Sequence, residues 1–239
     1  MRLHYSACAM SYTHSLSEAR AENHASVLAT IIQNRRPNAA LGLDVGTGQG
    51  KIALKLSEKT GINFIGLEPH LPMSRTIIGN LTIMKGSADQ IPFDDETFDV
   101  VTLISVYEHL LPAERLASLK EINRVLKDKG IVAGQIPNMY FPIELHSRLP
   151  FQSYLPQSLA EWYLKKFSTV PWKYNGMSWY RVGQRELKNE CSKAGFVKME
   201  IRKAKYPPEV IPCRFRWAIS LLHLFPLGYY FCFRKEHTA

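Results

Sequence analysis

Residues 41–51 read LGLDVGTGQGK, an apolar run that contains an aspartate and is followed by glycines at alternate positions. The run LGLDV is short and apolar enough to form a buried strand, and KIALKLSEKTG after it has the spacing of a helix that stops at Gly61. Glycine permits a sharp backbone turn and leaves no Cβ between the chain and a ligand. The stretch therefore predicts a strand, a tight loop that can lie against a ligand, and a helix.

Two well-known glycine loops do not fit this spacing. A phosphate-binding P-loop has a glycine five residues before its Gly-Lys pair and a serine or threonine after it. Those positions here hold Val45 and Ile52. A dinucleotide-binding loop has the pattern G-x-G-x-x-G. If Gly46 and Gly48 were its first two glycines, the third would fall at position 51, which is a lysine. Neither pattern is therefore present.

The rest of the chain alternates strand-like and helix-like segments, which indicates an α/β protein with a doubly wound parallel sheet. Seven strands are expected, at 41–45, 62–68, 81–86, 98–105, 131–138, 196–204 and 228–236. Helices are expected at 15–33, 51–61, 72–80, 112–130 and 185–195. We expect a mostly parallel sheet whose last strand is antiparallel, with helices on both faces.

The length of 239 residues and the hydrophobic fraction of 46% fit a single domain. After Asn138 the alternation stops, and a segment rich in proline and aromatic residues follows. We therefore divide the single domain 1–239 into a helical cap at 1–40, a ligand-binding half at 41–138, an insertion at 139–182, and a C-terminal helix with strands at 183–239.

The basic excess is confined to the C-terminal part of the chain. Residues 1–138 hold 14 basic and 14 acidic side chains, whereas residues 139–239 hold 16 and 7, which accounts for the net charge of +9. A solvated basic face and a surface for an anionic partner both fit this pattern. Segment 215–225 is too short to span a membrane and contains His223, so we expect a helix packed on the core or lying on a membrane surface.

Cysteine usage and the N-terminus bear on location. The four cysteines are scattered without a C-x-x-C pair or a metal-ligand spacing, so we expect a reducing compartment and no metal. Residues 1–15 lack the apolar core of a signal peptide. The predicted location is the cytoplasm, with peripheral contact to an anionic membrane surface as an open alternative.

Four segments occur in an order that belongs to a known family. They are Asp-x-Gly-x-Gly-x-Gly at 44–50, Glu68 at the end of the second strand, GSADQIPFDDETFDVV at 86–101 and ISVYEHLL at 104–111. This ordered set resembles class I methyltransferases that use S-adenosylmethionine, in particular the ubiquinone- and menaquinone-type enzymes, over about residues 41–138. The resemblance implies a Rossmann-like fold and S-adenosylmethionine as the cofactor.

The chemistry of that cofactor suits the residue types at these positions. It carries an ammonium and a sulfonium, which the carboxylate of Asp44 would attract. Glu68 is expected to accept hydrogen bonds from the ribose hydroxyls, and Asp89 is expected near the adenine amine. The predicted cofactor-binding residues are Asp44, Gly46, Thr47, Gly48, Gln49, Gly50, Glu68, Pro69, Ala88, Asp89, Gln90, Ser105, Val106 and His109.

The insertion is expected to form the acceptor site, because residues 41–138 are accounted for by cofactor binding. Methyl transfer from a sulfonium needs alignment and exclusion of water above all, and a general base only where the acceptor loses a proton. Candidate catalytic residues are His146, His109 and Glu144. Candidate acceptor contacts are Tyr140, Phe141, His146 and Trp179, with core packing and local loop ordering as the competing roles.

The predicted function is S-adenosylmethionine-dependent methylation, with an oxygen atom of a small-molecule, lipid-linked or glycan acceptor as the first expectation. Carbon or nitrogen methylation of a small metabolite or a quinone-like ring is an alternative. An RNA methyltransferase and a noncatalytic cofactor-binding protein are two others. A nucleic-acid partner is not expected, since no RNA-binding module is appended and no Asp/Asn-Pro-Pro-aromatic motif follows the fourth strand.

Overall fold

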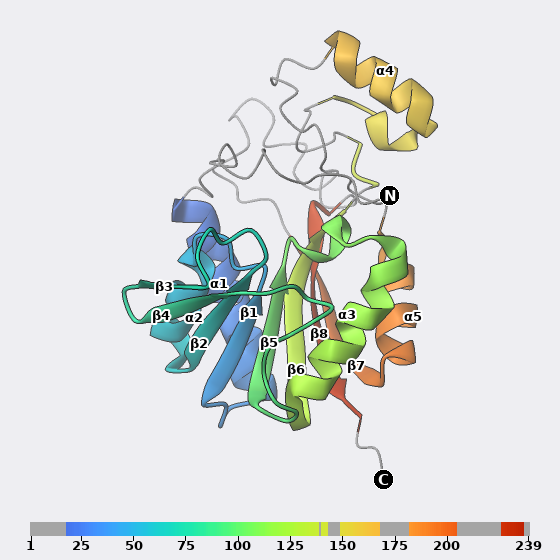
Figure 1. The fold of residues 1–239 in the computed structure, drawn as a ribbon. Coiled ribbons are helices and arrows are strands. Elements are labelled where there is room, and N and C mark those ends of the chain that lie inside the picture. Colours follow the sequence, from blue (N-terminus) through green and yellow to red (C-terminus); the bar gives the residue numbers. More distant parts are fainter. Residues whose placement is uncertain (1–17, 139, 143–148, 168–181, 205–225, 237–239) are drawn as a thin grey trace.

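The computed structural model describes residues 18–138, 140–142, 149–167, 182–204 and 226–236. These residues form one eight-stranded sheet with helices on both faces, as Figure 1 shows. The strand order is β3-β4-β2-β1-β5-β6-β8-β7. The predicted doubly wound, Rossmann-like α/β fold is confirmed, and the sheet has one strand more than predicted.

The centre of the sheet is parallel and its two sides are antiparallel. The strands are β1 Leu41–Val45, β2 Asn63–Glu68, β3 Arg75–Ile78, β4 Leu81–Lys85, β5 Phe98–Ile104, β6 Leu126–Pro137, β7 Phe196–Ala204 and β8 Gly228–Lys235. Strand β1 pairs in parallel with β2 and β5, β2 with β4, and β5 with β6. Strand β8 runs antiparallel to both β6 and β7, as predicted for the last strand.

The helices bury two separate hydrophobic cores against the two faces of the sheet. They are α1 Glu18–Arg35, α2 Lys51–Thr60, α3 Pro112–Val125, α4 Gln157–Phe167 and α5 Gln184–Lys193, with short 3-10 helices η1 Tyr107–His109 and η2 Gln152–Tyr154. Leu28 of α1 and Leu56 of α2 pack with Val100 of β5 on one face. Helices α3 and α5 cover the other face, where Leu119 and Leu187 are buried.

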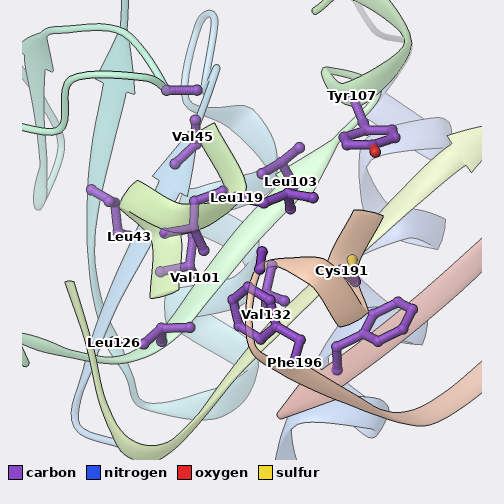
Figure 2. Packing of buried hydrophobic residues seen from close by; sticks show 14 of the residues in the cluster. Leu43, Val45, Val101, Leu103, Tyr107, Leu119, Leu126, Val132, Cys191 and Phe196 are labelled. Atoms are coloured by element: carbon purple, nitrogen blue, oxygen red, sulfur yellow. The ribbon is translucent and has the colours of Figure 1, made fainter. Parts of the chain in front are cut away.

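Strand β5 supplies both cores because its side chains alternate between the faces. Val101 and Leu103 pack toward α3, and Figure 2 shows them together with Leu43 and Leu119. Val100, one residue away, is fully buried on the opposite face. The nearly continuous apolar run of this strand is therefore explained by a central position covered on both sides.

The predicted helix at 72–80 is wrong, and part of that segment is the additional strand β3. It pairs antiparallel with β4, and the pair Gly79-Asn80 connects them, with Gly79 at φ 59°. Thr76, Ile77 and Ile78 are β-branched, which favours a strand. A two-residue glycine-containing connection is also a hairpin signal, so the sequence held the information for this hairpin.

The predicted helix at 112–130 is too long, because α3 ends at Val125 and β6 begins at Leu126. Leu126 already pairs with Phe98 of β5. Sheet pairing thus ends the helix before the glycine that we expected to stop it. The expected strand at 131–138 therefore starts five residues too late, because β6 is Leu126–Pro137, whereas the other expected strands agree with the structure to within about two residues.

Several predictions fall outside the described residues. Of the cap at 1–40, the structure describes α1 and the segment after it, and of the insertion at 139–182 it describes two short stretches with η2 and α4. Segment 215–225 lies outside the described ranges. Among the helices that are described, none is long and apolar enough to cross a membrane.

Candidate functional site

The predicted cofactor-binding residues follow strands that end at the same edge of the sheet. Strands β1, β2 and β5 are parallel neighbours, so the glycine loop, Glu68 and Ser105 come at one edge. Strand β6 runs parallel to β5 and ends at the same edge of the sheet. Gln135 lies near the end of β6, and Asn138 directly follows it. Ligands in open parallel sheets bind at the carboxyl ends of the strands, where the strand order changes direction.

The glycine loop after β1 needs its glycines for backbone conformation and for space. Gly46, Gly48 and Gly50 have φ values of 71°, 55° and 75°, a left-handed region that disfavours other residues. A Cβ on Gly46 would lie 2.4 Å from Val106 Cγ2. A Cβ on Gly48 would meet no atom within 4 Å. The loop is therefore packed tightly at its start and open at its middle, where a ligand can approach the backbone.

Backbone hydrogen bonds fix the loop to the neighbouring strand β2. The amides of Gly46 and Thr47 both donate to the carbonyl oxygen of Leu67, at 2.7 and 3.1 Å. The side chain of Thr47 lies over Gly66, where a Cβ would come within 2.6 Å of it. The loop conformation is thus set mainly by backbone contacts rather than by its own side chains.

Asp44 is a buried carboxyl group at the base of the loop. Its exposed fraction is 3%, and the hydroxyl of Thr102 donates to its Oδ1 at 2.6 Å. The two residues are direct partners in the β1–β5 register, so their side chains lie on the same face. Burial raises the pKa of Asp44 to about 6, although the hydrogen bond from Thr102 acts in the opposite direction. The group is therefore ionised at neutral pH and would gain from a cation beside it.

Glu68 lies at the end of β2 and faces the middle of the glycine loop. Its Oε2 accepts from the Gly48 amide at 2.9 Å, and its Oε1 accepts from the His70 amide at 3.1 Å. Both hydrogen bonds fix the carboxylate while leaving lone pairs on each oxygen. The arrangement can accept hydrogen bonds from a pair of hydroxyl groups such as those of a ribose.

The segment after β4 forms an apolar floor next to Glu68. The Gly86 amide lies 3.4 Å from the Glu68 carbonyl oxygen, so the segment begins beside that residue. Ala88 and Ile91 are buried, whereas Asp89 is exposed. This combination of an apolar surface and an accessible acceptor is what a flat aromatic base with an exocyclic amine requires.

The same segment is held from α3 by an arginine. Arg124 donates to the carbonyl oxygens of Ile91 and Phe93 at 3.0 and 2.8 Å. Glu121 binds the same guanidinium at 2.9 Å and accepts from the Ile91 amide at 3.2 Å. The floor is thereby anchored to a helix on the far side of the segment.

The exit of β5 brings Val106 against the loop, with Ser105 directly before it in the chain and His109 three residues after it. Ser105 has φ 53°, and its hydroxyl donates to Gln135 Oε1 at 2.7 Å. Val106 packs against Gly46. His109 is half-buried in η1, which is also held by a hydrogen bond from Tyr107 to Glu190 of α5.

The expected acceptor residues are only partly described. Tyr140 is 47% exposed, and its amide donates to Asn138 Oδ1 at 3.1 Å. Phe141 is buried. The other expected residues of the acceptor side, His146, Glu144 and Trp179, lie outside the described residues.

Sequence reasoning missed three polar residues of this region: Thr102, Gln135 and Asn138. Each is at most 9% exposed. Thr102 and Gln135 interrupt segments that were correctly predicted as apolar strands, and Asn138 directly follows β6. A polar residue in a strand that is buried on both faces needs a partner, which is the signal that could have identified them.

The residues at this edge fit S-adenosylmethionine. The open space beside Gly48 is a cradle that a side chain would obstruct. The buried Asp44 carboxyl group precedes the loop, and the Glu68 carboxylate accepts from the Gly48 amide. No anion-binding lysine is needed for a ligand without phosphates. Asp44 would take the positively charged end, Glu68 the ribose, and the Ala88–Ile91 floor the base.

Comparison with protein families agrees with this assignment. Residues 43–134 match the model of a methyltransferase domain. The demethylmenaquinone methyltransferase of Staphylococcus aureus (strain JH9) is 27% identical over 180 residues, which cover 70% of this chain and 71% of that protein.

Solved structures share the fold at low sequence identity. An S-adenosylmethionine-dependent methyltransferase from Mesorhizobium loti has a TM-score of 0.63 at 12% identity, over 90% of this chain and all of that one (100%). One from Methanosarcina mazei has a TM-score of 0.58 at 18% identity, over 87% and 98%. The 1,6-didemethyltoxoflavin N1-methyltransferase of Burkholderia thailandensis, solved with S-adenosylhomocysteine, has a TM-score of 0.55 at 14% identity, over 89% and 78%.

Proposed function

We propose that this protein, an S-adenosylmethionine-dependent methyltransferase, methylates an oxygen atom of a small-molecule or lipid-linked acceptor. The observation that carries the proposal of an acceptor that loses a proton, as a hydroxyl does, is the position of His109. It lies half-buried in η1, three residues after Val106, which itself touches the glycine loop. A histidine there can take the proton that a hydroxyl acceptor must lose.

In this proposal the chain contributes binding and alignment. The bound cofactor supplies an activated methyl group. Asp44 holds its positive end, Glu68 orients the ribose, and Ser105 with Gln135 bounds the side from which an acceptor would approach. Alignment of the acceptor atom and exclusion of water then provide most of the rate enhancement, and His109 removes the acceptor proton.

A second candidate is methylation of a carbon atom on a quinone-like ring. The similarity to the Staphylococcus aureus demethylmenaquinone methyltransferase favours it. A ring carbon that bears a hydrogen also loses a proton on methylation, so His109 has the same role in both candidates. Shared fold and distant similarity do not fix the acceptor, and the chemical form of the product must distinguish the two.

The test uses the purified enzyme with S-adenosylmethionine that carries a ¹³C methyl group. The enzyme is incubated with the lipid and the aqueous fractions of cell extracts, and release of S-adenosylhomocysteine is measured. The NMR shift of the transferred methyl group then identifies an O–CH₃ or a C–CH₃ product. We expect turnover with the lipid fraction and an O–CH₃ signal.

Matched variants connect the result to the site. Glu68→Gln should lower cofactor affinity strongly, whereas Glu114→Gln, an exposed carboxylate on α3, should not. His109→Gln should lower kcat with little change in cofactor affinity. A C–CH₃ signal would support the second candidate, and cofactor binding without turnover on any fraction would overturn both.

A further inference from the structure

Exposed apolar side chains gather on α4 and on the preceding η2 turn. Helix α4 packs against η2, and in Figure 1 it lies beyond the end of the sheet at which β5 and β6 finish. We define the α4–η2 surface by its exposed apolar and basic residues, Phe151, Tyr154, Leu159, Trp162, Lys165, Lys166 and Phe167. Pro156, Ser158 and the carboxylate of Glu161 are also exposed on this segment, so its two lysines exceed its acidic residues by one charge.

The apolar members of this surface are large and well exposed. Phe151, Tyr154 and Trp162 are 61%, 51% and 51% exposed, and Leu159 and Phe167 are 45% and 49% exposed. Single exposed apolar residues are common on proteins, but a cluster of this kind on neighbouring elements marks an interaction surface.

Phe151 has a second unusual property. Its φ of 57° places it in the left-handed region, which costs a bulky residue roughly 1–2 kcal/mol. Its ring is not buried in the core in return, since it is the most exposed of the apolar members of the surface. Strain that does not serve packing points to a function for the exposed ring.

Two lysines accompany the aromatic rings. The Lys166 ammonium lies 5.2 Å from the centre of the Trp162 ring and 5.7 Å from that of Phe167. Lys165 is exposed beside it, and both belong to the last turn of α4. The helix therefore presents an indole, a phenyl ring and two positive charges together.

This combination is complementary to an anionic lipid surface. Tryptophan and phenylalanine partition into the boundary between headgroups and acyl chains, while lysines reach to the phosphates. The helix of 11 residues can lie in that boundary, although it is too short to span a bilayer. The excess of basic residues after position 138 also attracts the chain to an anionic surface at long range.

The surface is also connected to the end of the sheet where the acceptor is expected. The Tyr154 hydroxyl donates to the carbonyl oxygen of Tyr140, whose amide is bound by Asn138 after β6. A bilayer against α4 would thus lie on the same side of the molecule as the cofactor site. A lipid-dissolved acceptor could reach the site from there without crossing water.

We propose that the α4–η2 surface docks the enzyme on an anionic lipid bilayer. This inference goes beyond the proposed function, because docking does not depend on which acceptor atom is methylated.

The test is flotation of the full chain with vesicles of phosphatidylcholine mixed with phosphatidylglycerol, without cofactor or acceptor. We expect binding at low salt that is strongly reduced at about 1 M salt, where the screening length is about 3 Å. Lys165→Gln/Lys166→Gln should weaken binding roughly 25-fold, at about fivefold for each lysine. Trp162→Ala should weaken it on the order of tenfold through lost apolar burial.

The matched control is Lys193→Gln/Lys198→Gln. Both lysines are exposed, on α5 and β7, and removing them changes net charge equally. Vesicle binding of this variant should remain within about threefold of the wild type if docking is local to α4 rather than general attraction. Calorimetry with S-adenosylmethionine shows whether each variant keeps a folded cofactor site.

Three results would overturn the inference. The first is a wild-type chain that does not float with these vesicles. The second is equal weakening by the α4 and the control lysine pairs. The third is a dimer in light scattering that Trp162→Ala dissociates, which would assign the surface to a second copy of the chain. Methyl transfer is measured separately with the lipid and aqueous extract fractions and without vesicles, so failure of docking and failure of the proposed activity are distinguishable.

Discussion

The glycine-loop edge of the sheet and the α4–η2 surface use their residues in opposite ways. The loop is shaped by its backbone, through left-handed glycines and amides that donate to Leu67, and its one conspicuous side chain, Asp44, is only 3% exposed. On α4, the conspicuous groups are side chains that are half-exposed and touch mainly one another. The difference teaches that a substitution at the loop should alter fold and cofactor binding together, whereas one on α4 should alter neither.

The largest effect is expected for Gly46→Ala. A left-handed φ of 71° costs about 1–2 kcal/mol for alanine, and overpacking against Val106 at 2.4 Å adds about 1–3 kcal/mol. We expect cofactor affinity to fall by at least about 30-fold, measured by calorimetry.

Gly61→Ala is its matched control, and Val106→Ala is a suppressor. Gly61 has a similar φ of 74° at the C-terminal cap of α2, and a Cβ there meets no atom within 4 Å. It should lose about 1–2 kcal/mol of stability with unchanged cofactor affinity. Adding Val106→Ala to Gly46→Ala should recover part of the loss, and no recovery would contradict the steric explanation.

The next largest effect is expected for Asp44→Asn, which should raise the stability of the protein while it lowers its affinity for the cofactor. The pKa of Asp44 is about 6 in the folded protein, above its ordinary value of 3.8. The folded protein therefore holds the Asp44 proton more tightly than the unfolded chain does. Burial of the charged carboxylate lowers stability by its full amount above about pH 6 and has no effect below about pH 4.

At pH 8 the free energy of unfolding of the variant should therefore exceed that of the wild type by at most about 3 kcal/mol, measured by denaturant unfolding. This difference should be gone at about pH 4. Loss of a charged partner should lower affinity for S-adenosylmethionine about tenfold or more. A variant that binds cofactor normally at pH 8 would remove Asp44 from the site.

A smaller effect is expected for Thr102→Val, which removes the hydroxyl that donates to Asp44 at 2.6 Å. Without that donor the pKa of Asp44 should rise further. Affinity for S-adenosylmethionine should fall about fivefold at pH 7, and the pH at which binding is lost should move upward. Thr102→Ser keeps the hydroxyl and should restore the wild-type pH profile, whereas equal behaviour of the two variants would indicate a packing effect only.

The smallest effect is expected for Trp162→Ala in the absence of lipid. The indole is 51% exposed, so its loss should change the free energy of unfolding by about 0.5 kcal/mol or less, measured by urea denaturation. Cofactor affinity should be unchanged. Destabilisation of more than about 2 kcal/mol would mean that the ring belongs to a core, and the contrast with the loop would no longer hold.

The local hydrophobic pattern predicted an element correctly where pairing in the sheet favours the same structure. The run FDVVTLI could only be a strand buried on both faces, and it is β5 at the centre of the sheet. The prediction failed at 75–78, where an edge hairpin replaces the expected helix, because the β-branched run and the Gly79-Asn80 connection were not interpreted together as a hairpin. It also failed to end α3 at Val125, where pairing of Leu126 with β5 decides the boundary.

By itself the sequence determined the α/β fold and the glycine loop, and the resemblance of its ordered motifs to a known family indicated the cofactor. The fold and the loop follow from short-range spacing and residue chemistry, which every stretch of chain carries locally. Only the tertiary structure decided that Thr102 is the partner of Asp44, that Gln135 binds Ser105 and that the rings of α4 are exposed. Partners that lie 58 and 30 residues apart are brought together by strand register, and exposure depends on what packs above a residue, so neither can be obtained from a single stretch of sequence.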